Sequence, residues 1–270
     1  MKTGVSTASL FLRKSNKQAL PLLEELGVKT VEVFLTSFSE YGQPFADTLK
    51  ACKGGLEINS VHALNTQFEP ELFNRHPLVK ADAYSMLEKV LETAKALDCP
   101  YYTLHGTSRF KRASRLEGAD NFPRMIECFS HLLDFCKARG VQLCLENVEW
   151  STYNRVGVFS RLSESLPNLL GVLDVKQARI SGYPYEAYLS EMGGRIAYAH
   201  LSDFKKEGGM CLPGKGDFDF DTLVKRLLDV GFNGALLLEV YNGDYDDVSE
   251  LKTACEYLDE ILYKNNCLNS

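Results

Sequence analysis

The sequence lacks several features that would place it in a specialised class of protein. Its 270 residues include eight cysteines but no Cys-x-x-Cys pair, so the scattered cysteines are expected to be reduced core residues and not a disulfide framework or a zinc knot. No stretch approaches the roughly 18 apolar residues of a membrane span, and the first residues lack the apolar run of a signal peptide. We therefore expect a cytoplasmic protein with no membrane partner.

The chain also has no excess of positive charge. Lys and Arg total 30 against 36 Asp and Glu, which gives a formal net charge of −6. Because proteins that bind nucleic acids typically present a basic face, a nucleic-acid partner is not expected. The exception is a basic run at residues 109–115, Arg-Phe-Lys-Arg-Ala-Ser-Arg, which we interpret as a lid loop that meets an anionic substrate.

What the chain does contain is a regular alternation of strand and helix patterns. Aliphatic and β-branched runs predict eight strands, at residues 2–6, 30–34, 57–62, 101–106, 141–146, 169–174, 195–201 and 235–240. Apolar residues at helical spacing predict helices at residues 17–26, 44–52, 81–97, 122–139, 158–166, 185–192, 218–229 and 248–263. Most strands are continuous apolar runs, as expected for parallel strands that are covered on both faces.

This alternation predicts an α/β fold of the (β/α)₈ TIM-barrel type, with residues 1–270 forming a single domain. A doubly wound open sheet is the alternative. It is disfavoured because no Gly-x-Gly-x-x-Gly motif follows the first strand, and because polar residues stand at the ends of many strands instead of at one crevice. No linker or change in composition indicates a second domain.

Acidic residues and histidines stand at or near the ends of seven predicted strands. They are Glu32, His62, His105, Glu146, Asp174, His200 and Glu239. The active site of a TIM barrel lies at these carboxyl ends, and carboxylates there are costly to bury unless they are paired or bound to a metal. Four of them come from consecutive strands: Glu146, Asp174, His200 and Glu239. One imidazole with three carboxylates suits one divalent ion, Mn²⁺, Mg²⁺, Co²⁺ or Zn²⁺.

The segments around these positions resemble the xylose isomerase-like TIM-barrel superfamily over nearly the whole chain. The similar segments are Leu-Glu146-Asn147, Val-Leu-Asp174, Ala-His200-Leu-Ser-Asp203, the Pro-Gly-Lys-Gly loop at 213–216 with Phe218 and Phe220, and Leu-Leu-Glu239. Within the superfamily, the sequence is most similar to the sugar phosphate isomerase/epimerase group, which includes ketose 3-epimerases and inosose-converting enzymes. These motifs are specific for the superfamily but not for a substrate.

The resemblance implies a metal-dependent isomerase or epimerase of a small sugar, a sugar phosphate or an inosose. It implies that Glu146, Asp174, His200 and Glu239 hold the metal, and that Glu146 and Glu239 also act as acid and base. A metal at the carbonyl and neighbouring hydroxyl oxygens stabilises an enediolate-like charge, so that a carboxylate can remove the adjacent proton. Return of the proton to the opposite face gives an epimer, and delivery to the neighbouring carbon gives an isomer.

Two positions depart from the pattern of the resembling family. Gln177 stands where relatives often have a histidine, and Lys206 stands where the epimerases have an arginine. Gln177 can still exchange hydrogen bonds with a sugar hydroxyl, whereas Lys206 and Lys176 favour an anionic group unless they are simply solvated. The other predicted substrate-binding residues are His62, His105 and Asp203.

Two further functions stay open. Apurinic endonucleases of the same superfamily bind three zinc ions through additional histidines, and His62 and His105 match two of those positions. The Asp-x-His pair that such enzymes carry after the seventh strand is absent, because residues 217–219 read Asp-Phe-Asp. The other alternative is a sugar-binding barrel without catalysis. The oligomeric state is also open, with a homo-oligomer as one option.

Overall fold

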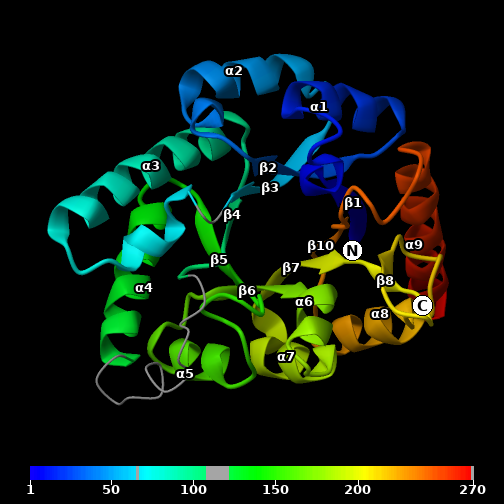
Figure 1. Ribbon diagram of the computed structural model, residues 1–270. Helices are drawn as coiled ribbons and strands as arrows, with labels where there is room; N and C mark the ends of the chain where they lie inside the picture. The colour runs from blue at the N-terminus through cyan, green and yellow to red at the C-terminus, as the bar shows by residue number, and fades with distance from the viewer. Residues whose placement is uncertain (65–66, 108–121, 269–270) are drawn as a thin grey trace.

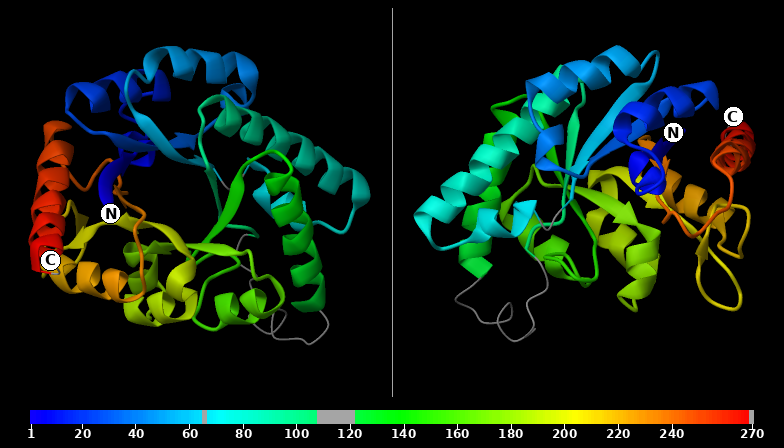
Figure 2. Two further views of the ribbon diagram at one scale, coloured as in Figure 1. Left: turned by 180° about the vertical axis from the view of Figure 1, so that it is seen from behind. Right: turned by 45° about the horizontal axis from the view of Figure 1, so that its top comes forward.

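The computed structural model describes residues 1–64, 67–107 and 122–268, and these form a closed parallel barrel surrounded by helices (Figures 1 and 2). The barrel strands are β1 (Lys2–Ser6), β2 (Thr30–Leu35), β3 (Glu57–Ala63), β4 (Tyr101–Leu104), β5 (Gln142–Glu146), β6 (Leu170–Asp174), β7 (Ile196–Leu201) and β10 (Ala235–Leu238). Each strand pairs with its neighbours in the chain, and β1 closes the barrel by pairing with β10. The predicted (β/α)₈ barrel is confirmed.

Helices form a ring around the barrel (Figure 1). They are α1 (Asn16–Glu25), α2 (Gln43–Cys52), α3 (Pro77–Ala96), α4 (Phe122–Lys137), α5 (Val158–Ser165), α6 (Val175–Ile180), α7 (Tyr185–Met192), α8 (Phe220–Asp229) and α9 (Ser249–Leu268). Short 3₁₀ helices lie at η1 (Thr7–Leu10), η2 (Phe38–Glu40), η4 (Glu69–Phe73) and η6 (Gly193–Arg195). No helix in the described ranges is both long and apolar enough to cross a membrane.

The burial of the strands and helices follows their hydrophobic patterns. All four residues of β10, Ala-Leu-Leu-Leu, are fully buried, since one face meets the barrel interior and the other meets helices. The interior beneath the strand ends is packed with Cys144, Val172, Tyr198 and Leu237. Burying one such large apolar side chain contributes about 1.5–3 kcal/mol. The barrel is therefore a packed scaffold, and the candidate ligand residues lie at the carboxyl ends of its strands.

Several elements differ from the sequence prediction. Helix α3 begins at Pro77 and not at residue 81, because proline at the first helical position costs no hydrogen bond. Helix α6 was not predicted; its six residues are too few to show helical periodicity, and it begins where the Asp174 side chain accepts a hydrogen bond from Gln177 N. A short antiparallel hairpin, β8 (Asp203–Phe204) with β9 (Met210–Cys211), interrupts the loop predicted after β7.

Candidate metal centre

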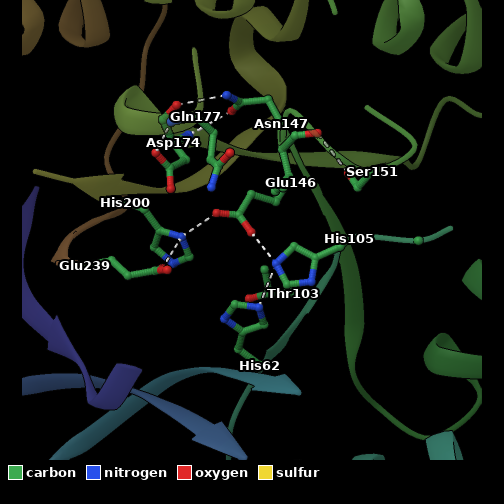
Figure 3. A network of polar contacts seen from close by, with 12 residues as sticks. His62, Thr103, His105, Glu146, Asn147, Ser151, Asp174, Gln177, His200 and Glu239 are labelled. Carbon is green, nitrogen blue, oxygen red and sulfur yellow. Dashed lines mark hydrogen bonds and ion pairs between the residues drawn. The ribbon is translucent and has the colours of Figure 1, made fainter. Parts of the chain in front are cut away.

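The four predicted metal ligands converge at the carboxyl end of the barrel (Figure 3). Glu146 and Asp174 end β5 and β6, His200 lies near the end of β7, and Glu239 follows β10. The strand register sets Asp174 directly beside His200. One ligand atom from each of the four residues lies within 4.8 Å of the others. Three consecutive strands and the last barrel strand thus bring these side chains, distant in sequence, to one point.

The polar contacts inside this group leave it short of positive charge. His200 Nδ1 lies 2.7 Å from Glu146 Oε1 and 2.7 Å from Glu239 Oε2, and one ring nitrogen has at most one proton to donate. Glu239 Oε2 is buried without a hydrogen-bond partner among the described atoms. Three nearly dehydrated carboxylates around one imidazole repel each other unless a cation lies between them. The donor set therefore fits a divalent ion.

The ionisation of these groups reflects their crowding. Burial, together with the nearby Glu146 and Glu239, raises the pKa of Asp174 to about 7, although Lys176 opposes this shift. Burial lowers the pKa of His200, but the three surrounding glutamates outweigh it and raise that pKa well above its usual value. Without a metal, positive charge is therefore supplied by protons. A divalent ion would displace these protons when it binds.

A fully buried carboxylate, that of Glu32, lies behind the imidazole of His200. Glu32 Oε1 lies 3.0 Å from His200 Nε2, the nitrogen that points away from the other carboxylates. Glu32 also accepts hydrogen bonds from three hydroxyl groups, those of Ser6 (2.9 Å), Ser60 (2.7 Å) and Thr103 (2.8 Å). A carboxylate behind a ligating histidine fixes the ring and its tautomer. The sequence placed Glu32 at a strand end, but only the structure shows that it lies behind His200 as an ion-pair partner, because His200 Nε2 makes no hydrogen bond within the described residues.

Asn147 holds the ends of β5 and β6 together. Its side-chain amide donates to Asp174 O and accepts from Asp174 N, both at 2.8 Å. Asp174 Oδ1 accepts the backbone N–H of Gln177 at 2.8 Å, which leaves Oδ2 facing the cluster. Asn147 thereby positions Asp174 relative to its neighbour Glu146. The Glu-Asn pair in the sequence was its only signal.

His62 and His105 form a second polar group on the other side of Glu146. Their Nε2 atoms lie 2.9 Å apart, and His105 Nε2 is 3.0 Å from Glu146 Oε2. Each Nδ1 faces a buried carboxylate at 3.6 Å, Glu32 behind His62 and Glu69 behind His105. Burial lowers the pKa of His105, but Glu146 and Glu69 outweigh it and raise the value to about 10. His62, His105 and Glu146 are themselves a candidate set of metal ligands.

Glu69 is a site residue that the sequence did not reveal. It comes from η4, outside the barrel strands, and is fully buried. Its carboxylate accepts hydrogen bonds from the Tyr102 hydroxyl at 2.6 Å and from the backbone N–H groups of His105 and Gly106 at 3.0 and 3.2 Å. Glu69 therefore fixes the end of β4 and lies behind the ring of His105, with Oε2 3.6 Å from His105 Nδ1. No strand-end pattern marks such a residue, because it enters the site from a connecting segment.

The predicted residues Lys176 and Gln177 both lie beside the cluster, on α6. Lys176 is 2% exposed, and its Nζ is 3.7 Å from both Asp174 Oδ2 and Glu239 Oε1. It is thus not a solvated surface lysine. Gln177 is also buried, and its Oε1 accepts the Glu149 backbone N–H at 3.2 Å. This bond directs the amide nitrogen of Gln177 toward the metal ligands (Figure 3).

Asp203 has a different environment from that expected of a substrate-binding residue. Both of its oxygens accept backbone N–H groups at 2.7–3.0 Å, from Phe204, Gly214, Gly216 and Phe218. A Cβ on Gly216 would lie 2.3 Å from Phe204 O, so only glycine permits this close approach. Asp203 therefore folds the Pro-Gly-Lys-Gly loop around its carboxylate. Because both carboxylate oxygens of Asp203 already accept backbone N–H groups, the loop and not a substrate is their principal partner.

Lys206 is not brought to the cluster. It lies between β8 and β9, its side chain is 83% exposed, and its ion-pair partner among the described residues is Asp217 at 3.8 Å. The expectation that Lys206 binds an anionic substrate is not supported by this position, because the hairpin directs it into solvent. The basic run at residues 109–115 lies outside the described residues.

Comparisons with known proteins agree with this architecture. The profile of a family described as "Xylose isomerase-like TIM barrel" matches residues 20–261. An uncharacterized protein of Methanocaldococcus jannaschii is 23% identical over 256 residues, which cover 89% of this chain and 88% of that protein.

Among solved structures, D-psicose 3-epimerase from Clostridium cellulolyticum with D-tagatose has a TM-score of 0.77 at 18% identity, with 97% of this chain and 99% of that chain covered. The IolI protein with a bound zinc atom has a TM-score of 0.76 at 18% identity, with 98% and 97% covered. At such low identity, the two structures show that the fold is shared.

Proposed function

The chain belongs to the xylose isomerase-like TIM-barrel family, and from this premise we propose that it is a metal-dependent isomerase or epimerase of a small sugar, sugar phosphate or inosose. The observation that carries the proposal is the convergence of Glu146, Asp174, His200 and Glu239 within 4.8 Å at the mouth of the barrel. The likeness of the fold to carbohydrate epimerases supports it.

In this proposal the four residues hold one divalent ion, Mn²⁺, Mg²⁺, Co²⁺ or Zn²⁺. When bound, such an ion supplies positive charge beside the carbonyl and hydroxyl oxygens of the sugar, which makes the neighbouring C–H group more acidic. Glu32 keeps His200 Nδ1 directed at the site, and Asn147 keeps Asp174 beside Glu146. The protein thus prepares the site before substrate arrives.

Glu146 and Glu239 are the proposed acid and base. They approach His200 Nδ1 from different strands, each at 2.7 Å, so the two carboxylates flank the same space. One removes the proton from carbon and the other returns a proton, either to the opposite face or to the neighbouring carbon. His62, His105 and Gln177 would bind sugar hydroxyl groups, because each offers a ring or amide nitrogen at the edge of the cluster.

The reaction is tested by incubating the Mn²⁺-loaded enzyme in D₂O with a panel of ketoses, inososes and their phosphates. Proton transfer through an enediolate should place deuterium on one carbon of the product, which mass spectrometry detects. Product formed without deuterium, under conditions where exchange is detectable, would indicate hydride transfer instead. The metal site is tested with the Glu146→Gln, His200→Ala double variant; full metal stoichiometry in this variant would rule out the assigned ligands.

A second function has one specific observation in its favour. His62, His105 and Glu146 form a further set of ligand atoms next to the first, as an apurinic endonuclease with several zinc ions would require. Residues 217–219 lack the additional histidine. Incubation of zinc-loaded protein with abasic-site DNA at low enzyme concentration tests this alternative, and absence of incision would remove it.

A further inference from the structure

Lys176 is a buried cation beside two of the proposed metal ligands. It is the second residue of α6, is 2% exposed, and lies with its Nζ 3.7 Å from Asp174 Oδ2 and 3.7 Å from Glu239 Oε1. Its Nζ also lies 4.6 Å from the centre of the Tyr241 ring. Both carboxylate distances exceed hydrogen-bond length, and within the described residues the structure gives Nζ no hydrogen bond. An ammonium group has three donors, and leaving them unpaired in the interior is costly.

The charges around Lys176 indicate what these donors are for. Glu146, Asp174 and Glu239 carry three negative charges, of which a divalent ion neutralises two. Lys176, whose Nζ is 3.7 Å from two of these three carboxylates, supplies a further positive charge beside them. Removal of a proton from carbon adds a negative charge to a substrate oxygen. Without Lys176, that charge would form beside the three carboxylates with one positive charge fewer in the site.

We infer that Lys176 is a catalytic residue whose ammonium group donates a hydrogen bond to the substrate oxygen that becomes negative. The inference rests on the proposed function. The C–H bond breaks and its proton goes to a glutamate, while its electron pair forms the carbon–carbon double bond and the carbonyl pair moves onto oxygen. Reprotonation of carbon reverses these shifts, and Lys176 keeps all its protons throughout.

This position also bears on the class of substrate. Lys176 Nζ lies between the carboxylates of Asp174 and Glu239, two proposed metal ligands, and not at the rim of the barrel. Its partner is therefore an oxygen of the reacting α-hydroxy carbonyl group and not a phosphate carried at the far end of a sugar. The charge of Lys176 is no evidence for a phosphorylated substrate, and an uncharged ketose or inosose satisfies it.

A purely structural lysine would stabilise the carboxylates without touching substrate, and the two roles predict opposite effects on metal binding. The Lys176→Met variant keeps an unbranched side chain, one atom shorter than that of lysine, but removes its charge. We expect it to bind Mn²⁺ as tightly as the wild type or more tightly, since a cation near the ligand oxygens has been removed. Its kcat should fall about 100- to 1,000-fold, as after loss of an oxyanion donor, while KM changes less than about threefold.

The experiment measures Mn²⁺ affinity by calorimetry, and kcat and KM in the Mn²⁺-loaded protein with the best substrate among D-tagatose, D-fructose and an inosose. Lys176→Arg, which keeps the charge, should recover at least about tenfold of the lost kcat. Lys176→Gln, which keeps a donor without the charge, should stay near Lys176→Met and serves if the Met variant does not fold. Lys252→Met, on the exposed face of α9, removes a lysine far from the site and is the matched control.

Loss of Mn²⁺ affinity in parallel with kcat would show a structural role and overturn the proposal. A rise in KM at unchanged kcat would show ground-state binding alone and would also overturn it. If the wild type binds Mn²⁺ but places no deuterium from D₂O on any panel member, the proposed function fails and the role of Lys176 falls with it. That outcome is recognised in the wild type alone, before any variant is compared.

Discussion

The two sides of the barrel mouth use different chemistry around one shared residue. On the side of β5, β6, β7 and β10, three carboxylates and the Nδ1 of His200 converge. On the side of β3 and β4, two imidazoles face each other through Nε2 atoms 2.9 Å apart. Glu146 belongs to both, with Oε1 toward His200 and Oε2 toward His105. The oxygen-rich side suits a divalent ion, and the nitrogen-rich side suits the hydroxyl groups of a substrate. The difference therefore suggests that one side of the mouth binds the metal and the other binds the substrate.

The largest effect should follow from removing the residue that both sides share. We expect Glu146→Gln to lower Mn²⁺ affinity by at least about 100-fold and kcat/KM by about 10,000-fold, because it removes a metal ligand and a proposed acid or base together. Calorimetry and steady-state kinetics measure both. Glu164→Gln, on the exposed surface of α5, is the control and should match the wild type. If Glu146→Gln keeps the bound ion and its activity, Glu146 is neither a metal ligand nor the acid or base.

The next largest effect should come from Asp174, which lies on the metal side alone. Asp174→Asn should weaken Mn²⁺ binding about 100-fold while it keeps the cap of α6, since asparagine caps helices well. In the metal-free protein the same change should stabilise the fold by about 2 kcal/mol at pH 8.

The reason lies in the raised pKa of Asp174, about 7 in the folded protein. A raised pKa favours folding when the group is protonated, and this advantage is lost as pH rises through about 7. Asparagine does not ionise, so the Asp174→Asn variant does not lose stability as pH rises through about 7. Thermal unfolding of the two metal-free proteins at pH 8 and pH 5 measures the difference, which should shrink at pH 5. Equal stabilities at pH 8 would contradict the proposed crowding of charge.

The metal side should also show a steep dependence on pH. Asp174, with a pKa of about 7, and His200, whose pKa is also raised, must lose their protons before they bind an ion. Mn²⁺ affinity should therefore rise about tenfold or more per pH unit between pH 5 and 7. Titrations in Asp174→Asn should show a shallower slope. An affinity that is independent of pH would exclude these protons as competitors.

Smaller effects are expected on the imidazole side. His62→Asn and His105→Asn should raise KM about tenfold, because each loses a hydrogen bond to a hydroxyl group, and should leave Mn²⁺ affinity within about threefold. Metal analysis of each variant tests the division between the two sides. If either variant loses an ion that the wild type holds, both sides bind metal and the second candidate function gains support.

The smallest effect is expected at Lys206, which the sequence placed in the site and the structure places in solvent. Lys206→Met should change kcat/KM less than about twofold, because an exposed ion pair with Asp217 contributes little. Lys176→Met, measured alongside, should differ from the wild type by orders of magnitude. A large loss in Lys206→Met would mean that the β8–β9 hairpin approaches the mouth when substrate binds.

Much of the fold could be predicted because each strand and helix repeats a local pattern. Eight apolar runs separated by amphipathic segments leave few arrangements other than a parallel barrel. The convergence of the four proposed metal ligands could be predicted for the same reason, since residues at the ends of parallel strands must meet at one end of the barrel. Helix α6 and the β8–β9 hairpin were missed because six and two residues are too short to show a period.

The sequence by itself determined the barrel and the identity of Glu146, Asp174, His200 and Glu239, because strand order and side-chain chemistry are encoded locally. Only the tertiary structure decided how the remaining charges are used. Glu69 enters from a connecting helix to meet His105 N at 3.0 Å, and Asp203 turns to its own loop. Of the two candidate lysines, Lys176 is buried and Lys206 is solvated. Partners and exposure depend on contacts between segments far apart in the chain, which no local pattern specifies.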